Sequence, residues 1–431
     1  MAHRASPPTP DRRRFLRWLA ASPLLATIPA CAPPRPGTAP SGSVPVPAGQ
    51  GTPPAPANPL GPFRHGGAPP LPSEAAAALD VFDMERVAAT TVPPAHFGYI
   101  QTGVDGEETQ LGNRTALERI HIRARRLVDV SRLDTRVTLF GREWPTPIII
   151  APCGSQKGFH PEGELATARA AQAAGHLQVL STVTSTAVEE VNEARGEPVW
   201  YQLYATSNWS VTEAVVERVR AAGCPVIVLT VDLPGGSNRL TLERWSRTDD
   251  RTCVSCHRPG GRAPTVKPMF QGTEYRPADF RTPGMTWDFI GQLREITDQK
   301  IVVKGLMTHE DARLALEHGV DAIWVSNHGG RSEGSGQATI DALPEIANAV
   351  NRRVPVIVDG GFRRGSDILK GIARGADAVA VGRPYLWGLG AFGQPGVERV
   401  LEILRRELAI TMRLAGTPSL ASIGESSIGR G

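Results

Sequence analysis

Acidic residues are absent from residues 32–72, and lysine is absent from residues 1–72. The first 72 residues contain seven arginines and a single acid, Asp11, so they account for the formal net charge of +4. Residues 73–431 contain 40 Lys+Arg and 42 Asp+Glu. Nucleic-acid affinity depends on a clustered excess of Lys and Arg, so this balance argues against a nucleic-acid partner.

The chain also lacks long apolar runs, and none approaches the roughly 20 residues that a membrane-spanning helix needs. Residues 32–72 hold 14 of the 38 prolines. Residues 73–431, by contrast, combine a mixed composition with recurrent short apolar runs, which excludes a collagen-like, coiled-coil or mainly disordered chain. We therefore expect the folded protein to comprise residues 73–431.

Residues 1–31 have the order of regions that an export signal requires. The basic run Asp11-Arg12-Arg13-Arg14-Phe15-Leu16-Arg17 precedes a short apolar stretch that ends at Cys31. The paired arginines resemble a twin-arginine signal, and residues 28–31 resemble a lipoprotein cleavage site with Cys31 as the lipidated residue; the alternative is a basic tail with an incidental cysteine. Residues 32–72 are then a Pro-rich disordered tether. We expect an exported protein on the periplasmic side, held to the membrane by a lipid anchor at Cys31.

Short β-branched runs alternate with alanine-rich amphipathic stretches from residue 148 onward. The amphipathic stretches include Glu162–Gly175, Val211–Ala222, Glu310–Gly319 and Ser366–Gly375, with glycines placed as helix terminators. The runs predict eight strands at Ile148–Ala151, Leu177–Thr182, Val199–Tyr204, Val226–Val231, Ile301–Lys304, Ala322–Ser326, Val356–Asp359 and Ala378–Val381. Eight such units indicate an α/β fold, a (β/α)8 TIM barrel, with an N-terminal helical segment and a long fourth βα loop over residues 233–283.

Polar residues follow nearly every predicted strand. In barrels of this kind the carboxyl ends of the strands meet at one rim, where the chemistry takes place. The polar strand ends are Pro152-Cys153-Gly154-Ser155, Ser181-Thr182, Gln202-Leu203-Tyr204, Thr230-Val231-Asp232, Lys304-Gly305, Ser326-Asn327-His328-Gly329-Gly330-Arg331, Asp359-Gly360-Gly361-Phe362-Arg363 and Gly382-Arg383-Pro384. So many polar groups on one rim predict a ligand site.

Two clusters on this rim suggest separate tasks. Gly361 and Arg363 after the seventh strand, with Gly382 and Arg383 after the eighth, bring backbone N–H groups and guanidiniums to the place where barrels commonly hold a cofactor phosphate. The second cluster sets His328 and Arg331 opposite Asp232 and Arg239. A histidine between a carboxylate and two guanidiniums is typical of a base beside a site for an anionic substrate.

These motifs, in this order and spacing from about Phe97 to the C-terminus, resemble the FMN-dependent L-2-hydroxy-acid oxidase and dehydrogenase family. The most specific are Ser326-Asn327-His328-Gly329-Gly330-Arg331, Gln202-Leu203-Tyr204, Leu229-Thr230-Val231-Asp232, Val303-Lys304-Gly305 and Asp359-Gly360-Gly361. The family includes glycolate oxidase, lactate oxidase and monooxygenase, mandelate dehydrogenase and the flavocytochrome lactate dehydrogenases. The resemblance implies oxidation of an L-2-hydroxy acid to the 2-oxo acid with FMN as cofactor.

The resemblance also implies roles for individual residues. His328 would be the base with Asp232 as its carboxylate partner, and Lys304 would lie against the N1/O2 side of the flavin. The substrate would be bound by Tyr99, Arg239, Arg331 and Tyr204. The flavin would be held by Pro152, Cys153, Gly154, Ser181, Gln202, Thr230, Ser326, Asp359, Gly361, Arg363, Gly382 and Arg383.

Two departures from the family pattern stand out. Val183 occupies the position where glycolate oxidases have a tryptophan, two residues after the flavin-contacting Ser181. A smaller side chain leaves room over the flavin, so we expect a substrate larger or more flexible than glycolate. After Arg331 the sequence runs Ser332-Glu333-Gly334-Ser335 in place of the family's usual short run ending in Leu-Asp, which leaves the hydrogen bonding around Arg331 open.

The long fourth loop contains Cys253-Val254-Ser255-Cys256-His257. Cys-x-x-Cys-His is the attachment pattern of c-type haem, in which His257 would ligate the iron. The alternatives are a Cys253–Cys256 disulfide or redox pair, a metal site, or free thiols. If the residues around His328 serve another purpose, the alternative function is a flavin- or haem-bearing electron-transfer protein without hydroxy-acid chemistry. The residues are compatible with oxygen, a quinone or a cytochrome as electron acceptor, and the family resemblance favours a homo-oligomer.

Overall fold

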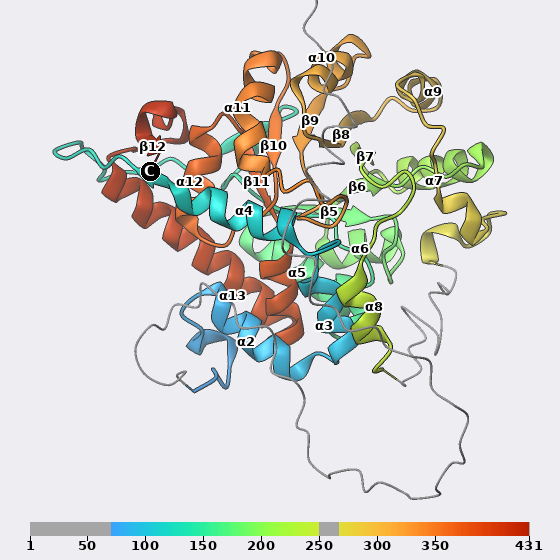
Figure 1. Cartoon of the computed structure of the whole chain (residues 1–431), viewed down its shortest axis with the longest axis horizontal. Coiled ribbons are helices and arrows are strands. Elements are labelled where there is room, and N and C mark those ends of the chain that lie inside the picture. Colours follow the sequence, from blue (N-terminus) through green and yellow to red (C-terminus); the bar gives the residue numbers. More distant parts are fainter. Residues whose placement is uncertain (1–69, 250–266, 431) are drawn as a thin grey trace, which may run out of the picture. The chain divides into compact units, whose positions relative to one another are not determined.

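A closed barrel of eight parallel strands forms the centre of the fold (Figure 1). The computed structural model of the protein describes residues 70–249 and 267–430. Neighbouring strands follow the order β10-β11-β4-β5-β6-β7-β8-β9. The strands are β4 (Ile148–Ile150), β5 (Leu177–Ser181), β6 (Trp200–Leu203), β7 (Val226–Thr230), β8 (Lys300–Leu306), β9 (Ala322–Val325), β10 (Val356–Val358) and β11 (Ala378–Val381). All eight strands expected from the sequence are present, and the (β/α)8 barrel is confirmed.

Helices alternate with these strands. They are α5 (Gly163–Ala174), α6 (Val188–Arg195), α7 (Trp209–Ala221), α9 (Asp288–Ile296), α10 (His309–Glu317), α11 (Thr339–Val350), α12 (Gly365–Ala373) and α13 (Arg383–Ala415). Their ends follow local chemistry: Thr308 caps α10 by accepting from the Asp311 N–H, and Gly175 ends α5 in the left-handed conformation, with φ of 67°.

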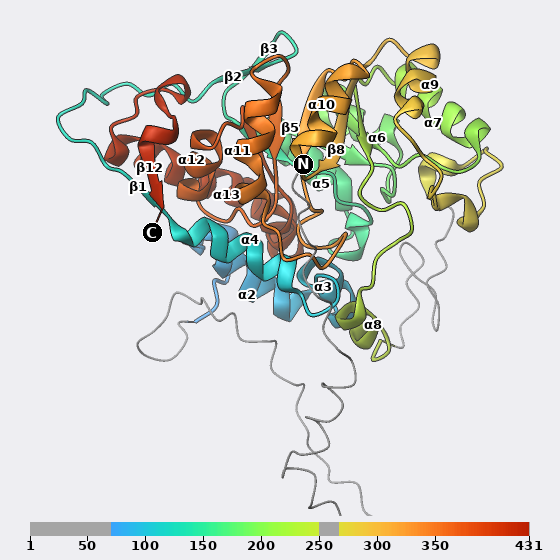
Figure 2. The same cartoon turned by 45° about the horizontal axis from the view of Figure 1, so that its top comes forward.

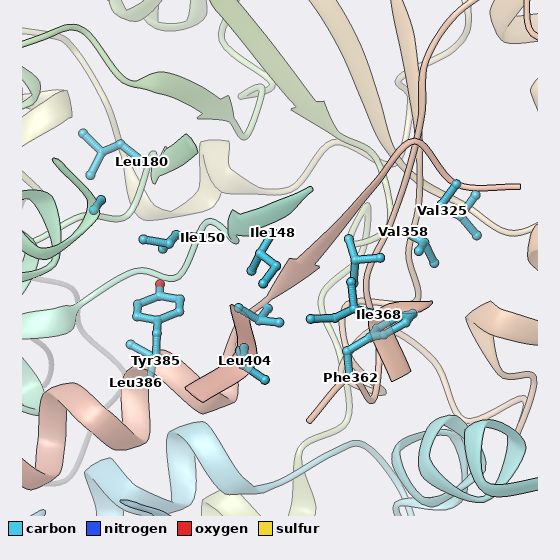
Figure 3. Close-up of a cluster of buried hydrophobic side chains, with 14 of the residues drawn as sticks. Ile148, Ile150, Leu180, Val325, Val358, Phe362, Ile368, Tyr385, Leu386 and Leu404 are labelled. Carbon is cyan, nitrogen blue, oxygen red and sulfur yellow. The ribbon is translucent and has the colours of Figure 1, made fainter. Parts of the chain in front are cut away.

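The strands are buried on both faces, which explains why they read as continuous apolar runs. In β4, Ile149 faces the interior of the barrel, where it packs in one cluster with Val179, Val228 and Trp324. Ile148 and Ile150 point the other way, into the layer between strands and helices. Figure 3 shows part of this second layer, with Leu404 and Tyr385 of α13 beside β4. The barrel interior is thus a packed core, and only the strand ends are free to form a site.

An N-terminal helical segment, also expected from the sequence, precedes the barrel. It consists of η2 (Ala75–Ala77), α2 (Val81–Thr91), α3 (Pro94–Gln101) and α4 (Glu108–Arg119). The hairpin of β2 (Val137–Leu139) and β3 (Arg142–Trp144) precedes the barrel (Figure 2). It brings Phe140 against Trp200, with ring centroids 5.2 Å apart. Strand β1 (Ile120–Ile122) pairs with β12 (Ile428–Arg430) near the C-terminus. The hairpin packs with the residues of the barrel interior at the amino ends of the strands, and the carboxyl ends remain available.

The long fourth loop contains more structure than the sequence indicated. Its first part forms the short helix α8 (Leu240–Ser246), and its last part forms the turns η4 (Pro268–Phe270) and η5 (Pro277–Phe280). Cys253, Cys256 and His257 lie outside the described residues, as do Cys31 and the rest of the leader. Across residues 70–249 and 267–430, no helix combines the length and the low polarity that crossing a membrane requires.

Candidate active site

The loop after β9 presents His328 through an unusual backbone. His328, Gly329 and Gly330 all have positive φ, at 58°, 66° and 77°. The left-handed region is strained for a residue with a side chain, and such residues concentrate at functional sites. The Ser326 hydroxyl accepts a hydrogen bond from the His328 N–H at 3.0 Å, which fixes the turn directly after the strand. The sequence Ser-Asn-His-Gly-Gly therefore forms a tight turn that directs the imidazole over the rim.

His328 bonds to Asp232, as the sequence predicted. The distance from His328 Nδ1 to Asp232 Oδ1 is 2.8 Å, and Tyr204 Oη lies 3.3 Å from His328 Nε2. An ionised carboxylate can only accept, so Nδ1 carries the proton and Nε2 keeps a lone pair facing Tyr204 and the cavity. Gly305 lets Asp232 approach, because a Cβ on this residue, with φ of 114°, would lie 2.7 Å from Asp232 Cβ.

The charges of these groups follow from burial and from their neighbours. Burial lowers the pKa of His328 below its usual value; Asp232 opposes this shift and Lys304 adds to it. Burial alone would raise the pKa of Asp232, but His328 and Lys304 together hold it below its usual value. Burial raises the pKa of Tyr204 well above its usual value. Near neutral pH the site therefore holds a neutral imidazole, a carboxylate and a protonated phenol, the states that a general base needs.

Lys304 is a buried cation between two carboxylates that do not bond to it directly. Its Nζ lies 3.7 Å from Asp232 Oδ2 and 3.8 Å from Asp359 Oδ2. Both Asp359 oxygens already accept other hydrogen bonds, from Ser326 Oγ at 2.8 Å and from Trp324 Nε1 at 3.0 Å. The ammonium group thus keeps donors for a ligand in the cavity. Trp324 was not predicted as part of the site, because only the three-dimensional structure brings its indole to Asp359.

Arg331 and Tyr99 form a second contact set on the same rim. Arg331 Nη1 donates to the backbone carbonyls of Tyr99 at 2.5 Å and Thr102 at 2.9 Å, and its guanidinium lies over the Tyr99 ring, 4.8 Å from the centroid. These bonds, with that from Thr109 Oγ1 to the Glu333 carbonyl at 2.9 Å, show how the divergent segment after Arg331 is held. Burial lowers the pKa of Arg331 to about 9, and the charge of Arg239 adds to the effect.

Neither Arg331 nor Arg239 forms an ion pair with a carboxylate among the described residues. The Arg239 Nε is buried without a hydrogen-bond partner. Arg239 also acts electrostatically on Asp232, Tyr204 and His328. Two guanidiniums that repel one another, with no ion pair to a carboxylate among the described residues, fit a site for the carboxylate of a ligand.

The predicted phosphate cluster lies at the ends of β10 and β11. Gly360 and Gly361 have φ of 101° and 87°, and a Cβ on Gly361 would lie 2.7 Å from the Asn113 carbonyl oxygen. Arg363 is stacked on the Trp387 ring at 4.9 Å, and burial lowers its pKa to about 10. Gly382 is the N-cap residue of α13, and Gly382, Arg383 and Leu386 line this end of the cavity.

Arg383 has a further structural task that the sequence did not reveal. It donates to the carbonyls of Ile100 at 2.7 Å, Gly329 at 2.8 Å and Thr102 at 3.2 Å, and to Gln110 Oε1 at 2.7 Å. Burial lowers its pKa to about 9. Arg383 thus connects the phosphate end of the rim to the His328 turn and to the end of α3. Gln110 and Thr102 lie far from it in the sequence, so no local pattern could identify them.

A cavity of about 110 Å³ joins the two clusters. Most of the predicted site residues line it: Tyr99, Pro152, Cys153, Gly154, Ser181, Tyr204, Lys304, His328, Arg331, Asp359, Gly361, Arg363, Gly382 and Arg383. Val183, Gly329 and Phe362 line it too. The remaining predicted residues, Gln202, Thr230, Asp232, Arg239 and Ser326, are not part of its lining, and Ser326 instead bonds to Asp359.

Unpaired polar atoms beside the cavity allow a test of whether FMN fits. Gln202 Nε2 and Thr230 Oγ1 are buried without a hydrogen-bond partner, while Gln202 Oε1 accepts from Ser181 Oγ at 3.0 Å. A flavin ring offers carbonyl and ring nitrogen atoms along one edge, and its phosphate needs cations at the other end of the molecule. Orphaned donors at one end and Arg363 at the other match both requirements, so the residues present fit FMN.

Comparison with known proteins agrees with this geometry. The sequence matches the family described as FMN-dependent dehydrogenase over residues 88–430. An L-lactate oxidase of Lysinibacillus sphaericus (strain C3-41) is 39% identical over 354 residues, which are 79% of this chain and 90% of the relative. A 4-hydroxymandelate oxidase of Amycolatopsis orientalis is 39% identical over 354 residues, which are 80% of this chain and 96% of the relative.

Solved structures show the same similarity in three dimensions. The crystal structure of mandelate oxidase with (S)-2-phenylpropionate has a TM-score of 0.70 and 36% sequence identity, and the match covers 82% of this chain and 99% of that chain. The matched sequence includes the whole barrel and the site built above. The chain belongs to the FMN-dependent dehydrogenase family.

Proposed function

We propose that the protein oxidises an L-2-hydroxy acid to the corresponding 2-oxo acid with FMN as the cofactor. The observation that carries this proposal is the His328–Asp232 pair on the same rim as the uncompensated guanidiniums Arg331 and Arg239. A base beside an anion site suits a substrate that bears a carboxylate next to the carbon that loses hydrogen. The names of the relatives, L-lactate oxidase and 4-hydroxymandelate oxidase, support the same substrate class.

The chain's own residues bind the substrate and move a proton. Arg331 and Arg239 hold the carboxylate, with the Tyr99 side chain at the same end of the cavity. His328 Nε2 takes a proton from the substrate, and Asp232 stabilises the imidazolium that results. Tyr204 lies within reach of the same nitrogen and donates to the substrate hydroxyl oxygen. Substrate binding therefore orients the carbon and hydroxyl toward the base and the cofactor.

Bound FMN supplies the two-electron acceptor. Lys304, held 3.7 Å and 3.8 Å from two carboxylates, would provide a fixed positive charge that stabilises the reduced flavin. Gly361, Arg363, Gly382 and the first turn of α13 would hold its phosphate.

Substitution of His328→Gln tests the proposal against its rival. We expect FMN to remain bound and its anaerobic reduction by 2-hydroxy acids to be lost, because glutamine cannot take up the proton. If the protein were an electron carrier without hydroxy-acid chemistry, 2-hydroxy acids would not reduce the flavin even in the unmodified protein. Reduction that persists in the variant would overturn the assignment of His328 as the base.

We propose a substrate larger than glycolate. Val183 lines the cavity and packs on Gly154, where a Cβ would lie 2.4 Å from Val183 Cγ2. A valine at this place leaves space that a tryptophan would fill. Turnover of glycolate, L-lactate and (S)-mandelate tests this, and Val183→Trp should shift the preference toward glycolate. A preference for glycolate in the unmodified protein would contradict the proposal.

The electron acceptor and the cellular setting also remain proposals. Oxygen is the proposed acceptor, since several relatives are named oxidases; reoxidation of the anaerobically reduced protein by oxygen, a quinone and a cytochrome tests it.

The arginine-rich leader supports export with a lipid anchor at Cys31, which mass spectrometry of the mature N-terminus tests. Haem at Cys253 and Cys256 predicts the sharp visible band of a reduced c-type haem after dithionite; a spectrum of flavin alone excludes it. Gel filtration with light scattering tests the proposed homo-oligomer.

A further inference from the structure

The short helix α8 of the fourth loop packs on α3 of the N-terminal segment, and the two lie side by side in both views (Figures 1 and 2). None of the seven residues of α8 is buried. Helices of this length do not persist alone in water, so α8 depends on what it touches. The main contact is Trp245, whose ring stacks on Phe97 with centroids 6.2 Å apart and an interplanar angle of 18°.

Trp245 fits against α3 because residue 98 is glycine. A Cβ on Gly98 would lie 2.6 Å from Trp245 Cε3 and 3.3 Å from Trp245 Cβ. The overlap is with the ring, and the Cβ of the tryptophan is also in tight contact at 3.3 Å, so both the ring and the backbone of α8 would have to move. An alanine at 98 would displace α8 as a unit, although alanine is the better helix former within α3.

Each partner in this contact adjoins a group of the active site. Gly98 is followed by Tyr99, which lines the cavity. Arg239 is the N-cap residue of α8. The preceding residue, Asn238, is tied to the N-terminal segment twice, since its Nδ2 donates to Asp105 Oδ1 at 2.7 Å and its carbonyl accepts from the Asp105 N–H at 3.0 Å. The position of α8 on α3 therefore sets the separation between Arg239 and Tyr99.

We propose that Trp245 is a positioning residue for the substrate carboxylate. Trp245 packs α8 against α3 at Gly98, where there is no side chain. This contact holds Arg239 and Tyr99, which are distant in the sequence, close enough to bind the same anion. The inference rests on the proposed function for the identity of that anion, but the docking itself is independent of any reaction. Trp245 touches neither the cavity nor the flavin-binding residues, so its loss leaves FMN binding intact.

The test uses three variants of the FMN-loaded full-length chain: Trp245→Ala, Gly98→Ala and the double variant. The probes are oxalate, a non-reacting carboxylate whose binding is followed by the flavin spectrum, and hydrogen exchange of residues 94–101. KM and kcat with L-lactate are measured in parallel. Gly291→Ala, a helical glycine of α9 with open space around it, and Trp209→Ala, which removes a tryptophan that packs on Phe289, are matched controls.

We expect both single variants to speed hydrogen exchange in α3 and to weaken oxalate roughly three- to tenfold, the range for loss of an aromatic contact. KM should rise by a similar factor while kcat changes less, and FMN content should not change. In the double variant the second change should add less than about twofold, because both act through one contact. The two controls should leave oxalate affinity unchanged.

Each contrary result overturns a defined part of the proposal. Unchanged exchange of residues 94–101 in Trp245→Ala would show that the docking does not stabilise α3. Faster exchange with unchanged oxalate affinity would show that the docking does not position the carboxylate site. Additive effects in the double variant would mean that the two residues act separately. If the unmodified protein binds oxalate but is reduced by no 2-hydroxy acid, the proposed function fails while the positioning role stands.

Discussion

Replacing Asp232 by asparagine should lower the rate of flavin reduction about a thousandfold while leaving FMN bound. Asp232 Oδ1 lies 2.8 Å from His328 Nδ1, and the carboxylate side chain is 5% exposed. Two opposite charges about 4 Å apart interact by about 4 kcal/mol at an effective dielectric constant near 20. That attraction develops only when His328 takes up the proton, so its loss raises the barrier by about this amount, which is roughly a factor of a thousand.

The assay is anaerobic stopped-flow reduction of the flavin by L-lactate over a range of pH. Asp232 raises the pKa of His328 against the effect of burial. Its removal should therefore move the acidic limb of kcat/KM to lower pH while the plateau falls. Asp321→Asn is a matched control. The Asp321 carboxylate accepts a hydrogen bond from the Ile301 N–H at the start of β8, at 2.9 Å, and lies away from the site. The substitution should cost stability and leave reduction unchanged. A rate for Asp232→Asn within about tenfold of the unmodified protein, or a limb that moves to higher pH, would refute the reasoning.

Three further results are expected. Lys304→Met should weaken sulfite binding to the flavin and slow reduction by roughly a hundredfold or more, since methionine removes the positive charge that stabilises the reduced flavin; unchanged sulfite affinity would contradict the role of Lys304. Gly305→Ala should impair reduction nearly as much as Asp232→Asn, because its Cβ would lie 2.7 Å from Asp232 Cβ; full activity would disprove the tight contact. In the unmodified protein the acidic limb of kcat/KM should lie below pH 6.5, because burial lowers the pKa of His328 from that value; a limb above it would contradict the neutral base.

The barrel strands could be predicted because their burial is a property of short continuous segments. Strands such as β4 and β10 are buried at every residue, and each therefore reads as an unbroken apolar run. The helix α8 could not be predicted in the same way. None of the residues of α8 is buried. Its main contact is the stacking of Trp245 on Phe97, which lies far away in the sequence, in the N-terminal segment.

The site shows the same division between local and long-range information. His328 and Asp232 could be identified because they follow strands β9 and β7, and Lys304 because it lies near the carboxyl end of β8; these strand ends of one barrel must meet. Trp324 and Gln110 could not, because they act through single hydrogen bonds to Asp359 and Arg383 that nothing in the local sequence signals. The predicted role of Arg383 in phosphate binding was likewise incomplete, since its side chain also bonds to Gly329 and Ile100.

Two neighbouring arginines after β10 should respond to substitution in opposite ways. Arg363 is buried near Arg114, and burial lowers its pKa to about 10, an effect that Glu85 and Asp367 oppose; it donates to the Phe362 carbonyl at 2.8 Å and, among the described residues, forms no ion pair with a carboxylate. Arg364, the next residue, pairs with Asp80 at 2.7 Å and with Glu407 at 3.0 Å. A buried cation without a partner opposes folding until a ligand neutralises it, whereas a paired one stabilises the fold through its partners.

Arg363→Met should therefore stabilise the protein freed of FMN, by about 1–2 kcal/mol, because a buried charge is replaced by an apolar side chain of similar length. The same substitution should weaken FMN about 10- to 100-fold, the loss expected for a charge-assisted bond to phosphate. Arg364→Met should destabilise both forms, because it leaves Asp80 and Glu407 without their cation. Thermal unfolding with and without FMN separates the two cases. If Arg363→Met lowered the melting temperature of the FMN-free protein as Arg364→Met does, Arg363 would be an ordinary structural cation, and the phosphate would have to be bound elsewhere on the rim.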